Sequence, residues 1–161
     1  MSVGVEVIEI LIVGTASSGK TTLLETLCRT VNQDGDWKAG RLRVDETLDA
    51  RFTEPPHAAF MWLRDIIEDT EASACLVMID STRPECFGET VGILQALLNT
   101  QPDMPLILVA NKQDHPGAWS ANDIRLGLRI PDSIPVVPCV ATDRSQVKRA
   151  VITLFNTVFA G

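Results

Sequence analysis

The chain has 161 residues, of which 45% are hydrophobic and only 5% aromatic, and its formal net charge at pH 7 is −7. This length suits a single compact domain spanning residues 1–161, and the scarcity of aromatic residues is typical of aliphatic cores built on buried parallel strands. The acidic balance argues against sequence-independent nucleic-acid binding, which requires a basic surface, and against electrostatic binding to anionic membranes.

The four cysteines have no CxxC spacing, so we expect buried, reduced thiols rather than a metal site or a disulfide framework. No stretch near the first residue is typical of a signal peptide, and no apolar run approaches the ~20 residues of a membrane span. The sequence also lacks an N-terminal glycine for myristoylation and a C-terminal cysteine for prenylation. These features predict a cytoplasmic protein without stable membrane insertion.

The pattern of apolar and polar residues predicts alternating strands and helices. A β-branched run predicts a first strand whose far end is buried on both faces, and Leu23, Leu24 and Leu27 indicate the apolar face of the helix that follows. In chain order, the first half is expected to form a strand over 5–13, a helix over 19–30, a loop over 31–40, a hairpin of strands over 41–44 and 48–52, and a helix over 57–69.

The second half continues the alternation with more uniformly apolar strands. Strands are expected over 74–79, 105–110 and 135–139, and helices over 86–99 and 144–159, with one further helix between the last two strands. This order predicts an α/β fold with a six-stranded, mostly parallel sheet, one antiparallel edge strand and helices on both faces. Ligands of such sheets bind beyond the carboxyl ends of the strands.

Residues 14–21, Gly-Thr-Ala-Ser-Ser-Gly-Lys-Thr, match the phosphate-binding pattern GxxxxGK[ST] between a buried strand and a helix, and they make the fold a P-loop three-layer domain. Backbone N–H groups would surround the β-phosphate, and Lys20 would bridge β- and γ-phosphate oxygens. Thr21 would ligate Mg²⁺, and Thr22 would reach the α-phosphate. The candidate phosphate-binding residues are Gly14, Ala16, Ser17, Ser18, Gly19, Lys20, Thr21 and Thr22. The alternative is a glycine-rich turn with a solvated lysine.

A second motif, Asn111-Lys112-Gln113-Asp114, directly follows a predicted strand. The Asp114 carboxylate could accept hydrogen bonds from guanine N1–H and N2–H₂, a pair of donors that adenine does not offer. Lys112 would lie over the base, and Asn111 would connect this loop to the phosphate-binding loop. We expect the N–H of Ala141, after the last strand, to donate to guanine O6. The alternative for residues 111–114 is an ordinary polar turn.

Together these motifs resemble the Ras-like small GTPase superfamily over essentially the whole chain. Residues 41–63 are similar to the bacterial small GTPases of the gliding-motility (MglA-like) branch and to their actinobacterial relatives encoded in conservon clusters. The resemblance implies a signalling switch that binds GTP and GDP with Mg²⁺. It also implies a regulatory protein of the roadblock type as partner, at the switch region and the helix over 57–69.

The sequence departs from the family pattern where the γ-phosphate is sensed. The gliding-motility branch has Thr-x-Pro-Gly-Gln, and Thr53-Glu54-Pro55-Pro56-His57 stands in its place. Pro56 lacks the N–H with which the family's glycine binds the γ-phosphate, although proline is also well suited to begin a helix. His57 stands where the family's glutamine orients the attacking water, so His57 and Lys20 are the catalytic candidates. The alternative for His57 is a solvated or capping side chain.

The first switch is also altered, because residues 31–40 contain no threonine or serine to meet Mg²⁺ and the γ-phosphate; Asp34 or Asp36 could reach the metal instead. Each oriented group lost can cost on the order of 3 kcal/mol of transition-state stabilisation, or ~10²-fold in rate. We therefore expect slow or partner-dependent GTP hydrolysis. The alternative is a pseudo-GTPase that holds nucleotide without efficient hydrolysis or switching. A P-loop kinase of small metabolites is disfavoured, because Asn-Lys-x-Asp has no role there.

The predicted helix over 57–69 has a second apolar feature besides its core stripe. Met61 and Trp62 fall outside that stripe, and an exposed pair of this kind would indicate a partner surface. The alternative is that both side chains pack under neighbouring loops.

Overall fold

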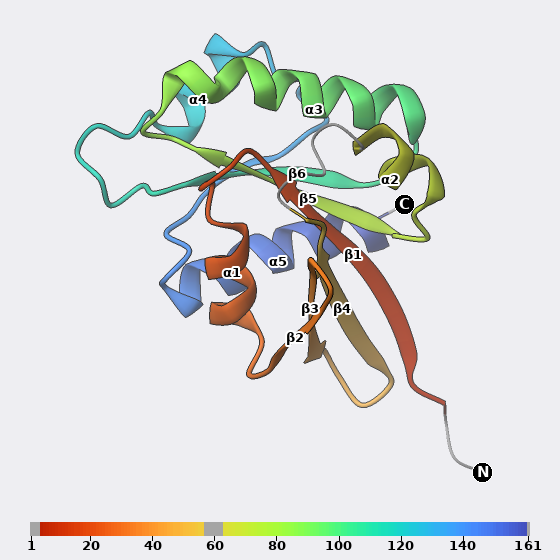
Figure 1. The fold of residues 1–161 in the computed structure, drawn as a ribbon. Coiled ribbons are helices and arrows are strands. Elements are labelled where there is room, and N and C mark those ends of the chain that lie inside the picture. The colour runs from red at the N-terminus through yellow and green to blue at the C-terminus, as the bar shows by residue number, and fades with distance from the viewer. Residues whose placement is uncertain (1–3, 57–62, 161) are drawn as a thin grey trace.

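The computed structural model of the chain describes residues 4–56 and 63–160. Within these ranges a seven-stranded sheet, in the order β2-β3-β4-β1-β5-β6-β7, has helices on both faces (Figure 1). The strands are β1 (Glu6–Gly14), β2 (Val31–Asp34), β3 (Trp37–Arg43), β4 (Leu48–Glu54), β5 (Ala74–Asp80), β6 (Leu106–Asn111) and β7 (Val136–Pro138). The helices are α1 (Lys20–Leu27), α2 (Leu63–Asp69), the 3₁₀ turn η2 (Pro84–Cys86), α3 (Phe87–Thr100), α4 (Ala121–Gly127) and α5 (Arg144–Phe159).

The sheet is mostly parallel, as expected. Strands β4, β1, β5, β6 and β7 pair in parallel, whereas β3 is antiparallel to β4 and β2 is antiparallel to β3. The predicted α/β fold is therefore confirmed, but the strand count is seven rather than six. The difference arises because residues 31–40 do not form the predicted loop: most of them pair as β2 and the start of β3.

A tight turn explains this additional strand. Asp34 pairs with Trp37, so only Gly35 and Asp36 connect β2 to β3, and Gly35 has a φ of +59°, in the left-handed region that favours glycine. A two-residue Gly-Asp connection is a hairpin signal even between polar strands. The antiparallel strand predicted at the sheet edge consequently lies one place inside it, and β2 forms the edge.

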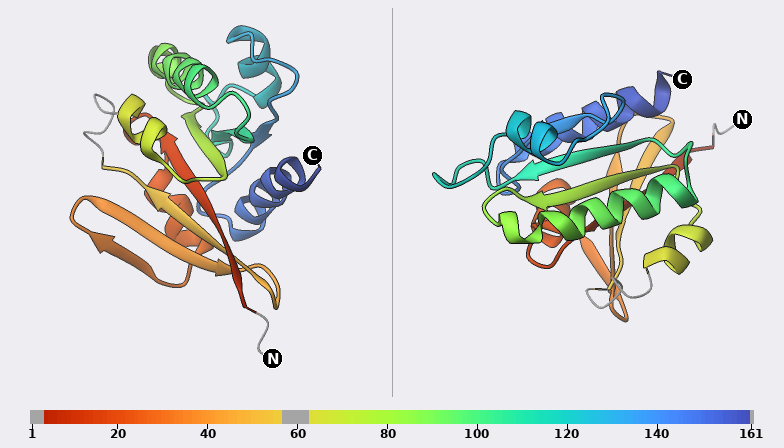
Figure 2. Two further views of the ribbon diagram at one scale, coloured as in Figure 1. Left: turned by 90° about the vertical axis from the view of Figure 1, so that its right-hand side faces the viewer. Right: turned by 90° about the horizontal axis from the view of Figure 1, so that it is seen from above.

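The two faces of the sheet bury separate hydrophobic cores. Helices α1 and α5 cover one face, and α2, α3 and α4 cover the other (Figure 2). Strands β5 and β6 lie between these layers, and every residue in both is buried. Their continuous apolar runs therefore reflect burial on both faces.

Some helix boundaries differ from the sequence prediction. Helix α1 ends at Leu27 rather than near residue 30, because Cys28 is already extended and the chain enters β2 three residues later. The helix expected between the last two strands is α4, and the Ser120 hydroxyl caps it by accepting a hydrogen bond from the N–H of Asp123. The described part of the helix expected over 57–69 is α2. Its residues 57–62, which include His57 and the partner surface predicted on Met61 and Trp62, lie outside the described residues.

The four cysteines are free thiols. Cys28, Cys75 and Cys139 are buried as expected, whereas Cys86, in the turn η2, is half-buried. Burial raises the pKa of Cys28 to about 11 and that of Cys139 to about 11, so both thiols stay protonated at neutral pH.

Among the helices in the described ranges, none combines the length and apolarity needed to cross a membrane.

Candidate nucleotide-binding site

A cleft of about 1130 Å³ opens at the carboxyl ends of the parallel strands. Strand pairing brings its parts together, since Gly14 lies beside Met78 and Asp80 lies beside Asn111 at the ends of β1, β5 and β6. The lining residues come from the phosphate-binding loop and α1, the β2–β3 hairpin, the end of β4, and the loops after β6 and β7. They include Ser17, Ser18, Gly19, Lys20, Thr21, Thr22, Gln33, Asp36, Lys38, Glu54, Pro56, Asn111, Lys112, Asp114, Ala141 and Thr142.

Most of the predicted binding residues therefore face one cavity. Gly14 and Ala16 line an adjoining cavity of about 260 Å³ instead, together with Lys20 and Pro56. Of the two aspartates proposed to reach a metal, Asp36 lines the main cleft. Asp34 lines a groove on the other side of the hairpin.

The phosphate-binding loop depends on glycine at position 19. Gly19 has a φ of +103°, and a Cβ atom there would lie 2.1 Å from the Asn111 Nδ2 atom. Any side chain would therefore strain the backbone and displace Asn111. Two hydroxyl groups in the loop, Thr15 Oγ1 and Ser18 Oγ, are buried with no hydrogen-bond partner in the described part of the chain. Buried polar atoms without partners are uncommon, and a bound ligand is one explanation for them.

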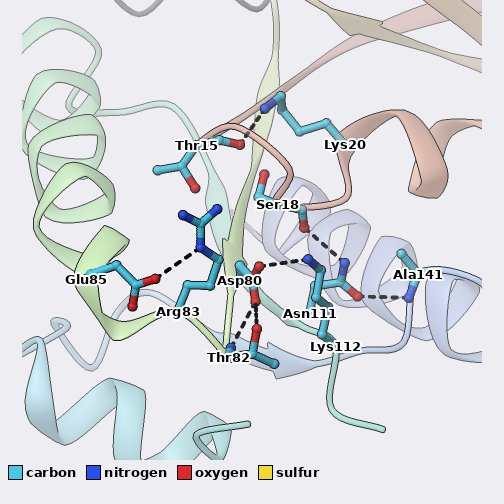
Figure 3. Close-up of polar contacts among 10 residues, drawn as sticks. All are labelled: Thr15, Ser18, Lys20, Asp80, Thr82, Arg83, Glu85, Asn111, Lys112 and Ala141. Atoms are coloured by element: carbon cyan, nitrogen blue, oxygen red, sulfur yellow. Dashed lines mark hydrogen bonds and ion pairs between the residues drawn. The ribbon is translucent and has the colours of Figure 1, made fainter. Parts of the chain in front are cut away.

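Lys20 closes over the loop that precedes it. Its Nζ atom donates hydrogen bonds to the carbonyl oxygens of Gly14 at 3.0 Å and Thr15 at 2.7 Å, the second of which is drawn in Figure 3. Burial lowers the pKa of Lys20; the nearby Glu54 carboxylate opposes this shift, and the Lys38 ammonium adds to it. A bound phosphate would give this half-desolvated ammonium a stronger acceptor than two carbonyl oxygens.

Asn111 connects three segments that are far apart in sequence. Its side-chain amide donates to the carbonyl oxygen of Ser18 at 3.0 Å and accepts from the N–H of Ala141 at 2.9 Å (Figure 3). The sequence predicted that Asn111 connects its own loop to the phosphate-binding loop. In the structure Asn111 also contacts the loop after β7, so it joins three segments. Because the Ala141 N–H is bound to Asn111, donation from it to guanine O6 would require that bond to be shared or exchanged. The neighbouring Thr142 also lines the cleft.

Lys112 is held by a carboxylate that the sequence analysis did not select. Its Nζ atom lies 2.7 Å from Asp80 Oδ2, while Asp80 Oδ1 accepts from the N–H and the hydroxyl of Thr82 (Figure 3). Burial alone would raise the pKa of Asp80, but the hydrogen bonds from Lys112 and Thr82 outweigh it and hold that pKa below its usual range. The backbone of Lys112 has a φ of +66°. Asp80 therefore fixes the direction of the lysine that is expected to lie over the base.

Asp114 is exposed at the mouth of the same cleft. Its loop is held by the preceding residue: Gln113 Nε2 donates to Ser81 Oγ and to the carbonyl oxygen of Trp119, both at 2.9 Å. Trp119 in turn packs edge-on against Phe87, with ring centroids 5.3 Å apart. The loop that carries Asp114 is thus held by the hydrogen bonds of Gln113 at its start and by the packing of Trp119 at its end, and Asp114 lines the cleft.

The region predicted to bind metal contains Thr21 and also Glu54, a residue that the sequence motifs did not indicate. The Thr21 hydroxyl donates to both carboxylate oxygens of Glu54, at 2.8 and 2.9 Å, and Glu54 is 8% exposed. Thr53 lies on the opposite face of β4, because side chains alternate along a strand. The buried Phe52, two residues before Glu54, was a signal that Glu54 also faces inward. Hydroxyl and carboxylate oxygens suit Mg²⁺, which proteins hold with one or two carboxylates together with phosphate oxygens.

Pro56 also lines the cleft, so the missing N–H lies beside the phosphate-binding loop. His57 lies outside the described residues, and its predicted role in orienting water stays a prediction.

Comparisons with known proteins identify related chains. The sequence model of the ADP-ribosylation factor family matches residues 61–158. ADP-ribosylation factor-like protein 10 from Mus musculus is 30% identical over 129 residues, which cover 74% of this chain and 52% of the relative. The chain thus spans about half the length of that curated relative.

A solved structure has the same fold. The Arl6 BBS3 small GTPase from Trypanosoma brucei with bound nucleotide analogue GppNp superposes with a TM-score of 0.77 at 16% identity, covering 95% of this chain and 98% of that one. The expected Ras-like architecture is therefore confirmed. The narrower resemblance to the gliding-motility branch stays a prediction.

Proposed function

This chain belongs to the ADP-ribosylation factor family of small GTPases, and we propose that its cleft binds GTP and GDP through the residues described above. The observation that supports this most strongly is the position of Asn111. One side chain joins the phosphate-binding loop to the loop after β7, and Asp114, three residues later, opens into the same cleft. A single nucleotide could therefore contact all three segments at once.

The bound nucleotide would engage groups that now bond to the protein itself. Lys20 would exchange the carbonyl oxygens of Gly14 and Thr15 for β- and γ-phosphate oxygens. The Asp114 carboxylate would accept from guanine N1–H and N2–H₂. The aliphatic part of Lys112 would cover the base while its ammonium stays paired with Asp80.

Mg²⁺ would be held by the Thr21 hydroxyl together with Glu54. Bound there, Mg²⁺ supplies charge neutralisation between the β- and γ-phosphates. Thr21 would hold the ion through a lone pair of its hydroxyl oxygen and Glu54 through a carboxylate oxygen, and the hydrogen bond between them could be kept or exchanged.

Hydrolysis is proposed to be slow or dependent on a partner. Pro56 cannot donate an N–H to the γ-phosphate, and residues 31–34 and 37–43 are paired in strands that contain no threonine or serine. These two observations equally support the alternative, a pseudo-GTPase that holds nucleotide as a cytoplasmic scaffold. In either case a regulatory protein, of the roadblock type by resemblance, is proposed to contact the switch region and the helix over 57–69.

Equilibrium competition against fluorescent GDP tests the proposed binding. We expect GTP and GDP to compete at similar concentrations and ATP to be weaker by about 10²-fold, because adenine leaves the Asp114 carboxylate without its donors. Equal competition by ATP would overturn the guanine assignment.

Single-turnover hydrolysis of GTP then separates the enzyme from the scaffold. If His57 orients water, His57→Ala should slow hydrolysis by roughly 10²-fold, whereas the surface control Asp103→Asn should leave the rate unchanged. Unaltered hydrolysis in His57→Ala would remove that role from His57. Guanine-selective binding with no turnover, even with a partner present, would favour the scaffold.

A further inference from the structure

A second lysine reaches the place where the metal is expected. Lys38, on β3, pairs directly across the antiparallel ladder with Glu54 on β4, so both side chains lie on the same face. Its Nζ atom lies 3.2 Å from Thr21 Oγ1 and donates a hydrogen bond to it. The Thr21 hydroxyl, near the start of α1, therefore accepts a hydrogen bond from the Lys38 ammonium while it donates to Glu54.

The position of Lys38 is set by the sheet and not by a loose loop. Strand β3 pairs with β4 from Arg43↔Asp49 to Lys38↔Glu54, and the turn at Gly35 begins only three residues before Lys38. On its inner side β3 packs tightly on the end of α1, since a Cβ atom at Gly40 would lie 2.7 Å from Cys28. The ammonium of Lys38 is thus held over the start of α1.

The charges around Thr21 favour anionic phosphate even without a metal. Lys20 and Lys38 provide two ammonium groups and Glu54 provides one carboxylate. The charges of Glu54 and Lys38 both act on the pKa of Lys20. The three groups therefore carry one net positive charge next to the expected β- and γ-phosphate positions. Moreover, Lys38 donates to Thr21 Oγ1, the same atom through which Thr21 would hold Mg²⁺.

Building on the proposed guanine-nucleotide site, we propose that Lys38 is a built-in counter-cation for the nucleotide phosphates. It occupies the Thr21–Glu54 position in the absence of metal and gives way to Mg²⁺ when the ion binds. The protein consequently retains guanine nucleotide after Mg²⁺ is removed, and Lys38 is the residue responsible.

The test measures the dissociation constant of fluorescent GDP twice, in millimolar Mg²⁺ and in excess EDTA. For the wild-type chain the two values should agree within about threefold. Lys38→Gln should bind nearly as tightly as wild type in Mg²⁺ but about 10- to 100-fold more weakly in EDTA, since a charge-assisted hydrogen bond to phosphate is lost only where no metal replaces it. Lys38→Arg, which keeps the charge, should restore binding in EDTA.

Lys148→Gln serves as the matched control, because it removes an exposed lysine of α5 that does not line the cleft. It should bind like wild type in both buffers, and thermal melts should show that each variant is folded. Three outcomes would overturn the inference: a wild type that loses GDP in EDTA as strongly as Lys38→Gln does, a Lys38→Gln that weakens equally in both buffers, or one that changes neither value.

The same measurements separate this inference from the proposed function. A wild-type chain that binds no guanine nucleotide in either buffer overturns both. Guanine-selective binding in Mg²⁺ that disappears in EDTA overturns only the role of Lys38.

Discussion

The proposed base-binding half of the cleft, around Asn111–Asp114, and its proposed phosphate-sensing half, around Thr21 and Glu54, differ in how their side chains are held. In the first half, Asn111 joins three segments, Asp80 fixes Lys112 and Gln113 fixes the loop before Trp119. In the second half, Thr21, Glu54 and Lys38 bond mainly to one another, and every group in that cluster is a phosphate or metal ligand by chemistry. The side chains of the first half are thus held by other segments of the protein, whereas those of the second are held by one another.

Among these substitutions, removal of the Asn111 side chain should lower the stability of the protein most. Asn111→Ala should lower the free energy of unfolding by about 3 kcal/mol, because the Ser18 carbonyl and the Ala141 N–H would both remain buried without their partner. Chemical denaturation checks this value, with Asn156→Ala on the exposed face of α5 as the control. A loss below about 0.5 kcal/mol would mean that the three segments are held by something else.

Asp80 should make a smaller contribution that depends on pH. Asp80→Asn should destabilise the chain by about 1–2 kcal/mol at pH 7, since the Lys112 ammonium loses a buried charged acceptor. The folded pKa of Asp80 lies below its ordinary value of 3.8. Its contribution is therefore fully present above that value and is lost as the pH falls through the folded pKa.

Denaturation of wild type and Asp80→Asn at several pH values measures this contribution. The gap between the two proteins should be constant near neutral pH and close below pH 3.8. A gap that widens on acidification would show that the paired carboxylate does not stabilise the base-binding half.

Gln113 belongs to the same half of the cleft, and its replacement should lower the stability less than that of Asp80. Gln113→Ala removes one bond to Ser81 and one to Trp119 at a part-exposed site, so we expect about 1 kcal/mol or less in stability. Amide hydrogen exchange should report faster opening of the loop over 112–119, with β5 unaffected. Unchanged exchange in that loop would argue that Gln113 does not hold it.

The smallest expected effect concerns titration in the phosphate-sensing half. Glu54→Gln should lower the pKa of Lys20 further, and Lys38→Gln should raise it, because Glu54 and Lys38 act on that ammonium with opposite signs. Lysine side-chain NMR can follow both shifts, with Lys148→Gln as the control. Shifts of the same sign in the two variants would contradict the proposed cluster.

The sequence predicted the fold well where burial dominates. Strands β5 and β6 are buried along their whole length, and their apolar runs located them within a residue or two. The polar strand β2 was missed because its pairing depends on the Gly35 turn and not on apolar alternation.

The site residues show a similar division. Most of the residues predicted from the two loop motifs line the cleft, Gly14 and Ala16 excepted, because the spacing of the motifs follows from the contacts that a nucleotide requires. Asp80 and Glu54 were missed because their roles depend on partners from other segments, Lys112 in the loop after β6 and Thr21 in α1, which no local pattern reveals.

The proposal that Asp114 selects guanine in this cleft is tested by the base preference of Asp114→Asn. An asparagine side chain can accept from the N1–H of xanthine and donate from its NH₂ group to the C2 carbonyl, whereas guanine presents two donor groups there. The variant should bind GDP about 10²-fold more weakly than wild type and xanthosine diphosphate more tightly, while Asp103→Asn should keep the wild-type preference. An Asp114→Asn chain that binds GDP as tightly as wild type would show that Asp114 does not select guanine.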